Sequence, residues 1–274
     1  MERIKREFGI NADCLKDVSE LDALEPIQKA GFASVFLMAY KHNEVAAIKE
    51  KADRLGLVVE FLHAPFNGIN SMWQPGDEYL DIYSKMTESI DSAASNGIEG
   101  VVVHVSSGFQ APPVNDVGLS RFDALVAHAQ EKGVKLVFEN LRMTGNLAYL
   151  VDRYEAMPHV MFCYDCGHEH CYTKTVRWLN IFTTRVFCTH IHDNPGRPFE
   201  DKVHDFDWHL LPFDGTCDYS QMMKDLDTYG YGGRLTLEVM QQKPEYEHWT
   251  AEEFLASCYE RITKIARINE PDIE

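Results

Sequence analysis

The sequence predicts one α/β domain of the (β/α)8 barrel class over residues 1–274, and three observations support this prediction. The first is a chain of 274 residues with 45% hydrophobic and 25% charged side chains, which is enough for a single large core. The second is an alternation of short apolar, β-branched runs with longer amphipathic stretches. The third is that polar side chains recur where the apolar runs end. Barrels of this class build their active sites at those strand ends.

Eight apolar runs are predicted to be strands, because buried parallel strands have nearly continuous hydrophobic sequences. They cover residues 7–12, 33–38, 57–63, 100–106, 135–141, 160–165, 186–192 and 234–240. Eight strands, each followed by a helix, fit the ~250 residues typical of a (β/α)8 barrel. A doubly wound open sheet is the alternative, and the number of strands alone does not exclude it.

Amphipathic stretches between these runs are predicted to be helices, since their apolar residues recur at helical spacing. They include Glu44–Leu55, Leu119–Lys132, Tyr219–Tyr229 and a final helix at Glu247–Ile268. Glycines close four segments as C′ residues, at Gly31, Gly56, Gly97 and Gly133.

The charge balance disfavours polyanionic partners. The chain has 26 basic and 43 acidic residues, a net charge of −17, so neither nucleic acid nor an anionic membrane is an expected partner. The N-terminal MERIKREFGI has no signal-peptide pattern, and no window approaches about 18 uncharged apolar residues. Seven cysteines, an odd number, do not suggest a disulfide framework. We therefore expect a soluble, cytoplasmic protein with reduced thiols.

Ionisable or amide side chains lie near the C-terminal ends of six consecutive predicted strands. They are His63, His104, Glu139 with Asn140, Asp165 with His168, His190 with His192, and Glu238. A single such residue is more often a hydrogen-bonded rim residue. A closed parallel barrel, however, brings all of these strand ends to one face. Burying so many ionisable groups together is costly unless a divalent cation pairs them, so the cluster predicts a metal site.

The types of ligand indicate which metals the site would bind. Carboxylates and imidazoles without dedicated thiolates suit Zn, Mn or Co better than Mg. One oxygen-rich site would be formed by Glu139, Asp165, His190 and Glu238. A second or third would use His63, His104 and His168, with Asp207 and His209 of DFDWHLLPFDG. We therefore expect one to three ions.

The stretch CYDCGHEHC at residues 163–171 raises a non-catalytic alternative, a local metal-binding or redox module. Such a module predicts a second Cys/His pair about 12–20 residues away, but the next cysteine, Cys188, stands alone. Cys163 and Cys166 straddle a predicted strand end, unlike a thioredoxin-like pair. We expect Asp165 and His168 to be the functional residues and the two cysteines to pack as small apolar side chains. His170 and Cys171 receive no predicted role.

Seven short segments, in order along the chain, resemble the xylose isomerase-like TIM-barrel superfamily. This group contains sugar phosphate isomerases and epimerases and is related to endonuclease IV. The segments are HAPFNGIN (63–70), VVVHVSSG (101–108), LVFENL (136–141), YDCGH (164–168), HIHDNPG (190–196), DWHLLPFDG (207–215) and LTLEVM (235–240). The resemblance extends from about Phe8 to Met240. It implies a (β/α)8 barrel enzyme that binds a divalent metal, takes a small sugar or sugar phosphate as substrate, and forms a homodimer.

The resemblance also implies roles for individual residues. In epimerase-like members four strand-end residues hold the metal, here Glu139, Asp165, His190 and Glu238, and the two glutamates form the acid–base pair. Endonuclease-like members add five ligands for a three-zinc cluster, here His63, His104, His168, Asp207 and His209. The acidic surface and the form of HAPFNGIN favour the isomerase interpretation. One departure from the pattern is that Phe213 and Asp214 replace the usual Gly-rich phrase.

The predicted function is a metal-dependent isomerase or epimerase that removes a proton from the carbon next to a carbonyl, through an enediolate. Predicted substrate contacts are His192, Asp193, Asn140, Arg197 and Trp73, with Arg142 and Lys202 as further cations for a phosphate or carboxylate. His192 and Asp193 would either contact substrate hydroxyls or orient the metal ligands. The alternative enzyme is an endonuclease IV-like multinuclear zinc phosphodiesterase, in which the metals activate a water molecule.

Overall fold

The computed structural model describes residues 4–173, 175–201 and 203–270, and its eight strands confirm the predicted (β/α)8 barrel with parallel strands. The strands are β1 Phe8–Asn11, β2 Ser34–Leu37, β3 Val58–His63, β4 Gly100–Val103, β5 Lys135–Glu139, β6 Val160–Asp165, β7 Val186–His190 and β8 Leu235–Leu237. They follow one another in the order β7-β6-β5-β4-β3-β2-β1-β8. A parallel bridge between Ile191 and Leu237 also joins the ends of β7 and β8, which closes the sheet.

The helices alternate with the strands as predicted. They are α1 Glu20–Lys29, α2 His42–Leu55, α3 Leu80–Ser95, α4 Asp116–Lys132, α5 Thr144–Arg153, α6 Cys166–Tyr172, α7 Leu179–Phe182, α8 Tyr219–Thr228 and α9 Ala251–Arg267, with 3-10 turns η1 Ile69–Trp73 and η2 Thr183–Arg185. Gly56 and Gly133 end α2 and α4 in the left-handed conformation, as their C′ positions predict. The final helix begins at Ala251, because Thr250 and Glu253 form a capping box there.

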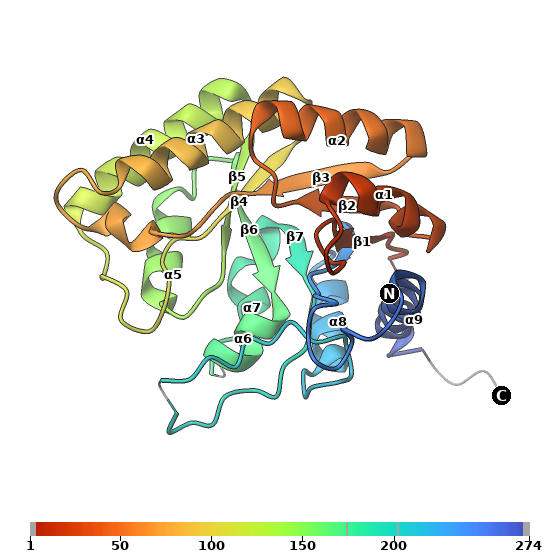
Figure 1. The fold of residues 1–274 in the computed structure, drawn as a ribbon. Coiled ribbons are helices and arrows are strands. Elements are labelled where there is room, and N and C mark those ends of the chain that lie inside the picture. Colours follow the sequence, from red (N-terminus) through yellow and green to blue (C-terminus); the bar gives the residue numbers. More distant parts are fainter. Residues whose placement is uncertain (1–3, 174, 202, 271–274) are drawn as a thin grey trace. The chain divides into compact units, whose positions relative to one another are not determined.

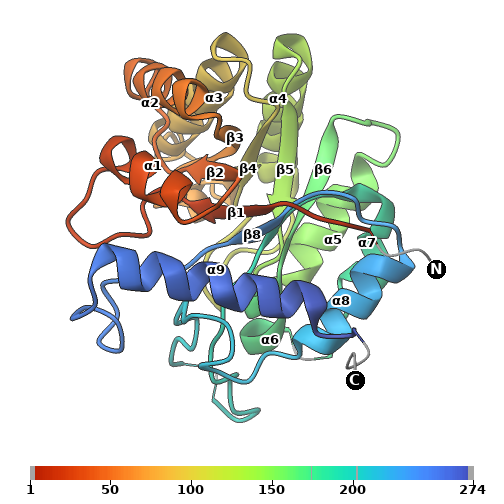
Figure 2. The same ribbon diagram turned by 90° about the vertical axis from the view of Figure 1, so that its right-hand side faces the viewer.

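Two compact units can be distinguished by their internal contacts. In the unit Phe36–Cys163, helices α2, α3 and α4 cover β3, β4 and β5 (Figure 1). In the unit formed by Met1–Val35 and Tyr164–Glu274, α9 packs beside α1 and α8 and against β8 (Figure 2). The organisation of residues 1–274 as a single domain stays a prediction.

Trp73 is a core residue of the unit Phe36–Cys163. Its side chain is 2% exposed, its Nε1 donates to the Val105 carbonyl at 2.7 Å, and its ring lies 5.0 Å from that of Phe122. Gly118 in α4 makes room for the indole, since a Cβ atom there would lie 1.9 Å from Trp73 Cε3. The glycine is therefore needed for packing.

Replacing Gly118 by alanine is expected to destabilise the protein by about 1–3 kcal/mol, because the added methyl group overpacks the core around Trp73. Gly145→Ala in α5 is the matched control, because a Cβ atom there would have no neighbour within 4 Å and alanine favours helix by up to about 1 kcal/mol. Urea unfolding measures both variants. Equal stabilities would contradict this account of the packing.

The described ranges contain no helix that is long and apolar enough to cross a bilayer. All seven cysteines lie within these ranges, and no two of them form a disulfide there.

Candidate metal centre

Histidines and carboxylates lie at the C-terminal ends of three strands in the unit Phe36–Cys163. His63 is the last residue of β3, His104 directly follows β4, and Glu139 is the last residue of β5. The Glu139 Oε2 atom is 3.2 Å from His63 Nε2 and 3.1 Å from His104 Nε2, and all three side chains are buried. The predicted strand-end residues of this unit therefore converge on one carboxylate.

The hydrogen bonding of His63 is typical of a metal ligand. Its Nδ1 lies 3.0 Å from the Ala64 carbonyl oxygen, to which it can donate, and its Nε2 lies 3.2 Å from Glu139 Oε2. Metal-binding histidines commonly donate their other N–H to a backbone carbonyl in this way. Its Nε2 and the Glu139 carboxylate thus face each other as two possible ligands of one cation.

A second set of strand-end residues belongs to the other unit. Asp165 ends β6, His190 ends β7, and Glu238 directly follows β8. His190 Nδ1 is 3.2 Å from Glu238 Oε2 and 3.8 Å from Asp165 Oδ2. Asp165 and His190 are fully buried, whereas the Glu238 side chain keeps 13% of its surface exposed. Glu238 is thus the member of this set that a solute can reach.

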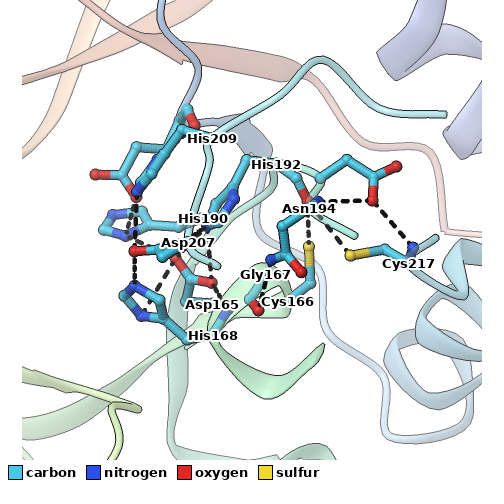
Figure 3. Close-up of polar contacts among 12 residues, drawn as sticks. Asp165, Cys166, Gly167, His168, His190, His192, Asn194, Asp207, His209 and Cys217 are labelled. Carbon is cyan, nitrogen blue, oxygen red and sulfur yellow. Dashed lines mark hydrogen bonds and ion pairs between the residues drawn. The ribbon is translucent and has the colours of Figure 1, made fainter. Parts of the chain in front are cut away.

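Four further side chains of the same unit form what we call the loop cluster: His168, His192, Asp207 and His209 (Figure 3). One possible ligand atom from each of them lies within 4.8 Å of all the others. Asp207 Oδ2 is 3.0 Å from His168 Nε2 and 3.2 Å from His209 Nε2. The Nδ1 of His209 donates to the Glu238 carbonyl at 3.0 Å, the same arrangement as at His63.

Local structure explains how the CYDCGHEHC stretch contributes to the loop cluster. Asp165 is the N-cap of α6, and its Oδ1 accepts the backbone N–H of His168 at 2.6 Å. The same carboxylate bonds His192 Nε2 at 3.1 Å. Gly167 permits the close approach of that ring, because a Cβ atom there would lie 2.0 Å from His192 Cε1. The D-x-x-H spacing is therefore that of a helix cap.

The electrostatics of the loop cluster favour positive charge. Burial alone would lower the pKa of His192, but the nearby Asp165 carboxylate outweighs burial and raises that pKa to about 9. The pKa of His209 is also raised, since Asp207 outweighs the effect of its burial. Burial would raise the pKa of Asp207, yet His209 and His168 hold it well below its usual range. The carboxylates of Asp165 and Asp207 thus favour positive charge at this position.

The described residues fit a metal ion on two further counts. His192 Nδ1 and Asp207 Oδ1 are buried, and neither has a hydrogen-bond partner in the described part of the chain. The donors are imidazole and carboxylate, which Zn, Mn and Co accept. Buried histidine and carboxylate clusters are thus consistent with divalent metal binding.

The loop that carries Asp207 and His209 is held at its base by Asp193. The backbones of Asp193 and Leu210 exchange two hydrogen bonds of 2.9 Å. Asp193 Oδ1 accepts the N–H groups of Asn194 and Cys217, and Oδ2 accepts that of Phe213. Both carboxylate oxygens, predicted to contact substrate, thus bond to backbone.

Asp193→Asn is expected to destabilise the protein by about 1–3 kcal/mol, because an amide NH₂ group would face a buried N–H donor. Asp218→Asn is the control: Asp218 caps α8 through Gln221, and asparagine caps equally well. Thermal unfolding measures both variants. A loss of stability in Asp218→Asn as large as that in Asp193→Asn would refute the specific role of Asp193.

The structure explains why Phe213 and Asp214 can replace the Gly-rich phrase that is usual in the family pattern. Phe213 adopts a positive φ of 75°, and Asp214 accepts from the Tyr246 hydroxyl at 2.7 Å. Asp214 also pairs with Arg261 of α9 at 2.6 Å. These contacts tie the turn to the C-terminal helix in place of a glycine-rich phrase.

The remaining predicted residues lie as follows. Arg197 donates to the carbonyls of Cys171, Tyr172 and Asp201 and so shapes the loop that carries it. Asn140 is buried, and the Arg142 guanidinium lies 5.1 Å from the Phe109 ring. His170 bonds Thr216 at 2.8 Å, while Cys171 is buried. Lys202 lies outside the described residues. Roles in substrate binding for Asn140, Arg197, His192, Asp193 and Trp73 stay predictions.

A (β/α)8 barrel with buried histidines and carboxylates at its strand ends defines a class of barrels suited to metal-dependent chemistry. Residues 20–258 match the model of the xylose isomerase-like TIM barrel family, so the chain belongs to this family. The resemblance found in the sequence is thereby confirmed.

One individual relative matches a smaller part of the chain than the family model does. The uncharacterized protein y4fM of Sinorhizobium fredii is 30% identical over 197 residues, which are 63% of this chain and 60% of that protein, so the match spans less than two thirds of the relative.

Solved structures show the same fold. The IOLI protein, solved with a binding zinc atom, has a TM-score of 0.76 at 18% identity and covers 96% of this chain and 98% of its own. D-psicose 3-epimerase with D-tagatose, from Clostridium cellulolyticum H10, has a TM-score of 0.71 at 13% identity over 97% and 100% of the two chains. Sugar epimerases are therefore among the structural neighbours.

Proposed function

We propose that this protein is a metal-dependent isomerase or epimerase of a small sugar or sugar phosphate. The observation that carries the proposal is the set Asp165, His190 and Glu238. Two of its members are fully buried, and the third is a carboxylate that remains reachable. The two buried side chains can bind a cation, while the partly exposed carboxylate of Glu238 can contact a substrate. The epimerase neighbours support the same class of reaction.

Four residues would hold the cation of this site. Asp165, His190 and Glu238 belong to one unit, and we propose Glu139 as the fourth ligand, because parallel barrels bring the C-terminal ends of their strands to one face. A divalent cation bound there would polarise a carbonyl oxygen and stabilise negative charge that develops on it.

The two glutamates are proposed as the acid–base pair. One carboxylate removes the proton from the carbon next to the carbonyl, and the other returns a proton. Return to the opposite face of the same carbon gives epimerisation, whereas return to the neighbouring carbon gives isomerisation. The 3.2 Å contact with His190 Nδ1 fixes the orientation of the Glu238 carboxylate. This lowers the entropy that the carboxylate loses when it reaches the orientation needed for proton transfer.

A multinuclear zinc phosphodiesterase is the second candidate, and the loop cluster is the observation that favours it. Its three histidines and one aspartate offer a second cation position within one unit. A second cation could help to generate a hydroxide nucleophile from water. The net charge of −17 weighs against a nucleic acid substrate, because phosphate backbones need basic side chains.

Metal analysis of protein purified without added metal, paired with an activity screen, tests the proposal. The screen includes ketoses, ketose phosphates and an oligonucleotide with an abasic site. Bound metal with turnover of a ketose or ketose phosphate is expected. Cleavage of the oligonucleotide by a three-zinc form, without activity on sugars, would establish the second candidate instead. Absence of metal and of any activity would refute both.

A further inference from the structure

The dipeptide Asn-Gly occurs twice in the chain, and both copies lie in the unit Phe36–Cys163. One is Asn67–Gly68, in the turn between β3 and η1, and the other is Asn96–Gly97, which directly follows α3. An asparagine before glycine can lose its side-chain amide, because glycine has no Cβ atom that keeps its backbone nitrogen away from the amide carbon. The two copies have similar intrinsic reactivity, so the surrounding structure decides which of them reacts.

Asn67 and Gly68 form the exposed centre of a tight turn. The Ile69 N–H donates to the Phe66 carbonyl at 3.0 Å, and Gly68 adopts φ 87° and ψ 5°, the conformation of the third residue of a type II turn. A Cβ atom built on Gly68 would have no neighbour within 4 Å. Within the described ranges, neither the Asn67 side chain nor the Gly68 N–H makes a hydrogen bond. The two reacting groups can therefore approach each other without losing a hydrogen bond of their own.

Asn96 and Gly97 have the same chemistry in a protected setting. Asn96 is the C-cap of α3, and its Nδ2 donates to the Ser92 carbonyl at 2.8 Å. The Gly97 N–H, whose nitrogen would be the nucleophile, donates to the Ala94 carbonyl at 3.4 Å. Both reacting groups must give up a hydrogen bond before they can react, and we expect this to slow the reaction by about tenfold.

We propose that Asn67 is a site of spontaneous deamidation in the folded protein. The Gly68 nitrogen attacks the Asn67 Cγ atom, a new N–C bond forms, and the bond between Cγ and Nδ2 breaks. Ammonia leaves with the hydrogen of the Gly68 N–H, and a succinimide ring remains. One water molecule then opens the ring. Attack of water on Cγ gives aspartate, whereas attack on the backbone carbonyl carbon gives isoaspartate. Either product carries a carboxylate in place of a neutral amide.

The turn lies next to a proposed metal ligand. The Phe66 ring stacks on the His104 ring, with 4.2 Å between the centroids and 18° between the planes. Isoaspartate adds one methylene to the backbone between Phe66 and Ile69 and so changes the geometry of the turn that positions this ring. We therefore expect the deamidated form to convert the sugar more slowly. This consequence rests on the proposed function, whereas the deamidation does not.

Incubation of the full-length protein at mildly alkaline pH, in water labelled with heavy oxygen, tests the proposal. Trypsin cleaves after Lys85 and places the two Asn-Gly copies in separate peptides, whose deamidation is measured by mass spectrometry. Digestion in ordinary water ensures that the label marks only earlier deamidation. In the folded protein, Asn67 should deamidate about tenfold faster than Asn96. In urea the two rates should become similar, because the protection of Asn96 depends on the fold.

Matched variants accompany this measurement. Asn67→Gln should prevent deamidation at this position, because the longer side chain would have to close a six-membered ring. Asn96→Gln should leave the rate at Asn67 unchanged. Equal rates at the two sites of the folded protein would overturn the proposal. The same holds if Asn67 is stable in the folded protein while both sites react in urea. The unmodified chain gives this answer even if neither variant folds.

The consequence for the site is tested separately. Anion exchange separates the deamidated protein, which has one more negative charge, and sugar conversion is then compared between the two forms. Equal rates of conversion would refute the link between the turn and the site. Deamidation at Asn67 without sugar conversion by either form would count against the proposed function alone.

Discussion

Glu238→Gln is expected to lower proton exchange at the substrate carbon by on the order of 10²–10⁴-fold, because glutamine keeps the shape of the side chain but cannot accept the proton. The same loss is expected for Glu139→Gln. Exchange is followed by NMR in D₂O with the sugar that the activity screen identifies. Near-full exchange in either variant would show that the acid–base assignment is wrong.

Two controls make this experiment specific. Glu247→Gln removes an exposed carboxylate of the same unit, one that pairs with Lys16, and should leave exchange unchanged. Glu238 is also a proposed ligand, so bound metal must be measured in each variant. A Glu238→Gln protein that holds its metal but does not exchange protons would separate the acid–base role from the ligand role.

His209→Asn is expected to weaken metal binding at the loop cluster by at least about 100-fold, since even groups that only support ligands change affinity by 10–100-fold. Asparagine suits this position because it tolerates the positive φ of 48° found at His209. Metal analysis and Co²⁺ titration by visible absorption measure the loss.

The matched control for this variant is His204→Asn in the same loop. The His204 side chain is 76% exposed and pairs with Asp201, away from the loop cluster. It should bind as much Co²⁺ as the unchanged protein. Equal affinities of the His204 and His209 variants would mean that the loop cluster does not hold a metal.

The strands could be predicted from the sequence because each is a nearly continuous apolar run, which is typical of a buried parallel strand. All eight were located, but β4, β7 and β8 end up to three residues earlier than expected, at Val103, His190 and Leu237. β4 and β8 are followed directly by His104 and Glu238, whose side chains lie in the clusters, and β7 ends at His190, which is itself a member of a cluster. Apolar patterns do not mark these strand ends.

The candidate site was only partly predictable. The predicted strand ends and the family resemblance pointed to Asp165, His168, Asp207 and His209, which the structure brings together in one unit. His192, predicted to contact substrate or to orient ligands, lies buried in the loop cluster, and its role stays a prediction. Its separation from His190 by two residues was a usable signal, since such residues share a face of an extended chain. The need for Gly167 depends on a ring 25 positions further along the chain, and no local pattern reveals it.

The short backbone bridge between Asp193 and Leu210 also has a consequence for how this protein can diversify. It closes the base of the loop, so the tip that carries the exposed Phe199 and Val203 can vary in length while the base keeps its geometry. Natural variation and laboratory grafting should therefore concentrate at this tip. Relatives with new substrate preferences could arise by exchange of the tip, with Asp207 and His209 inherited unchanged.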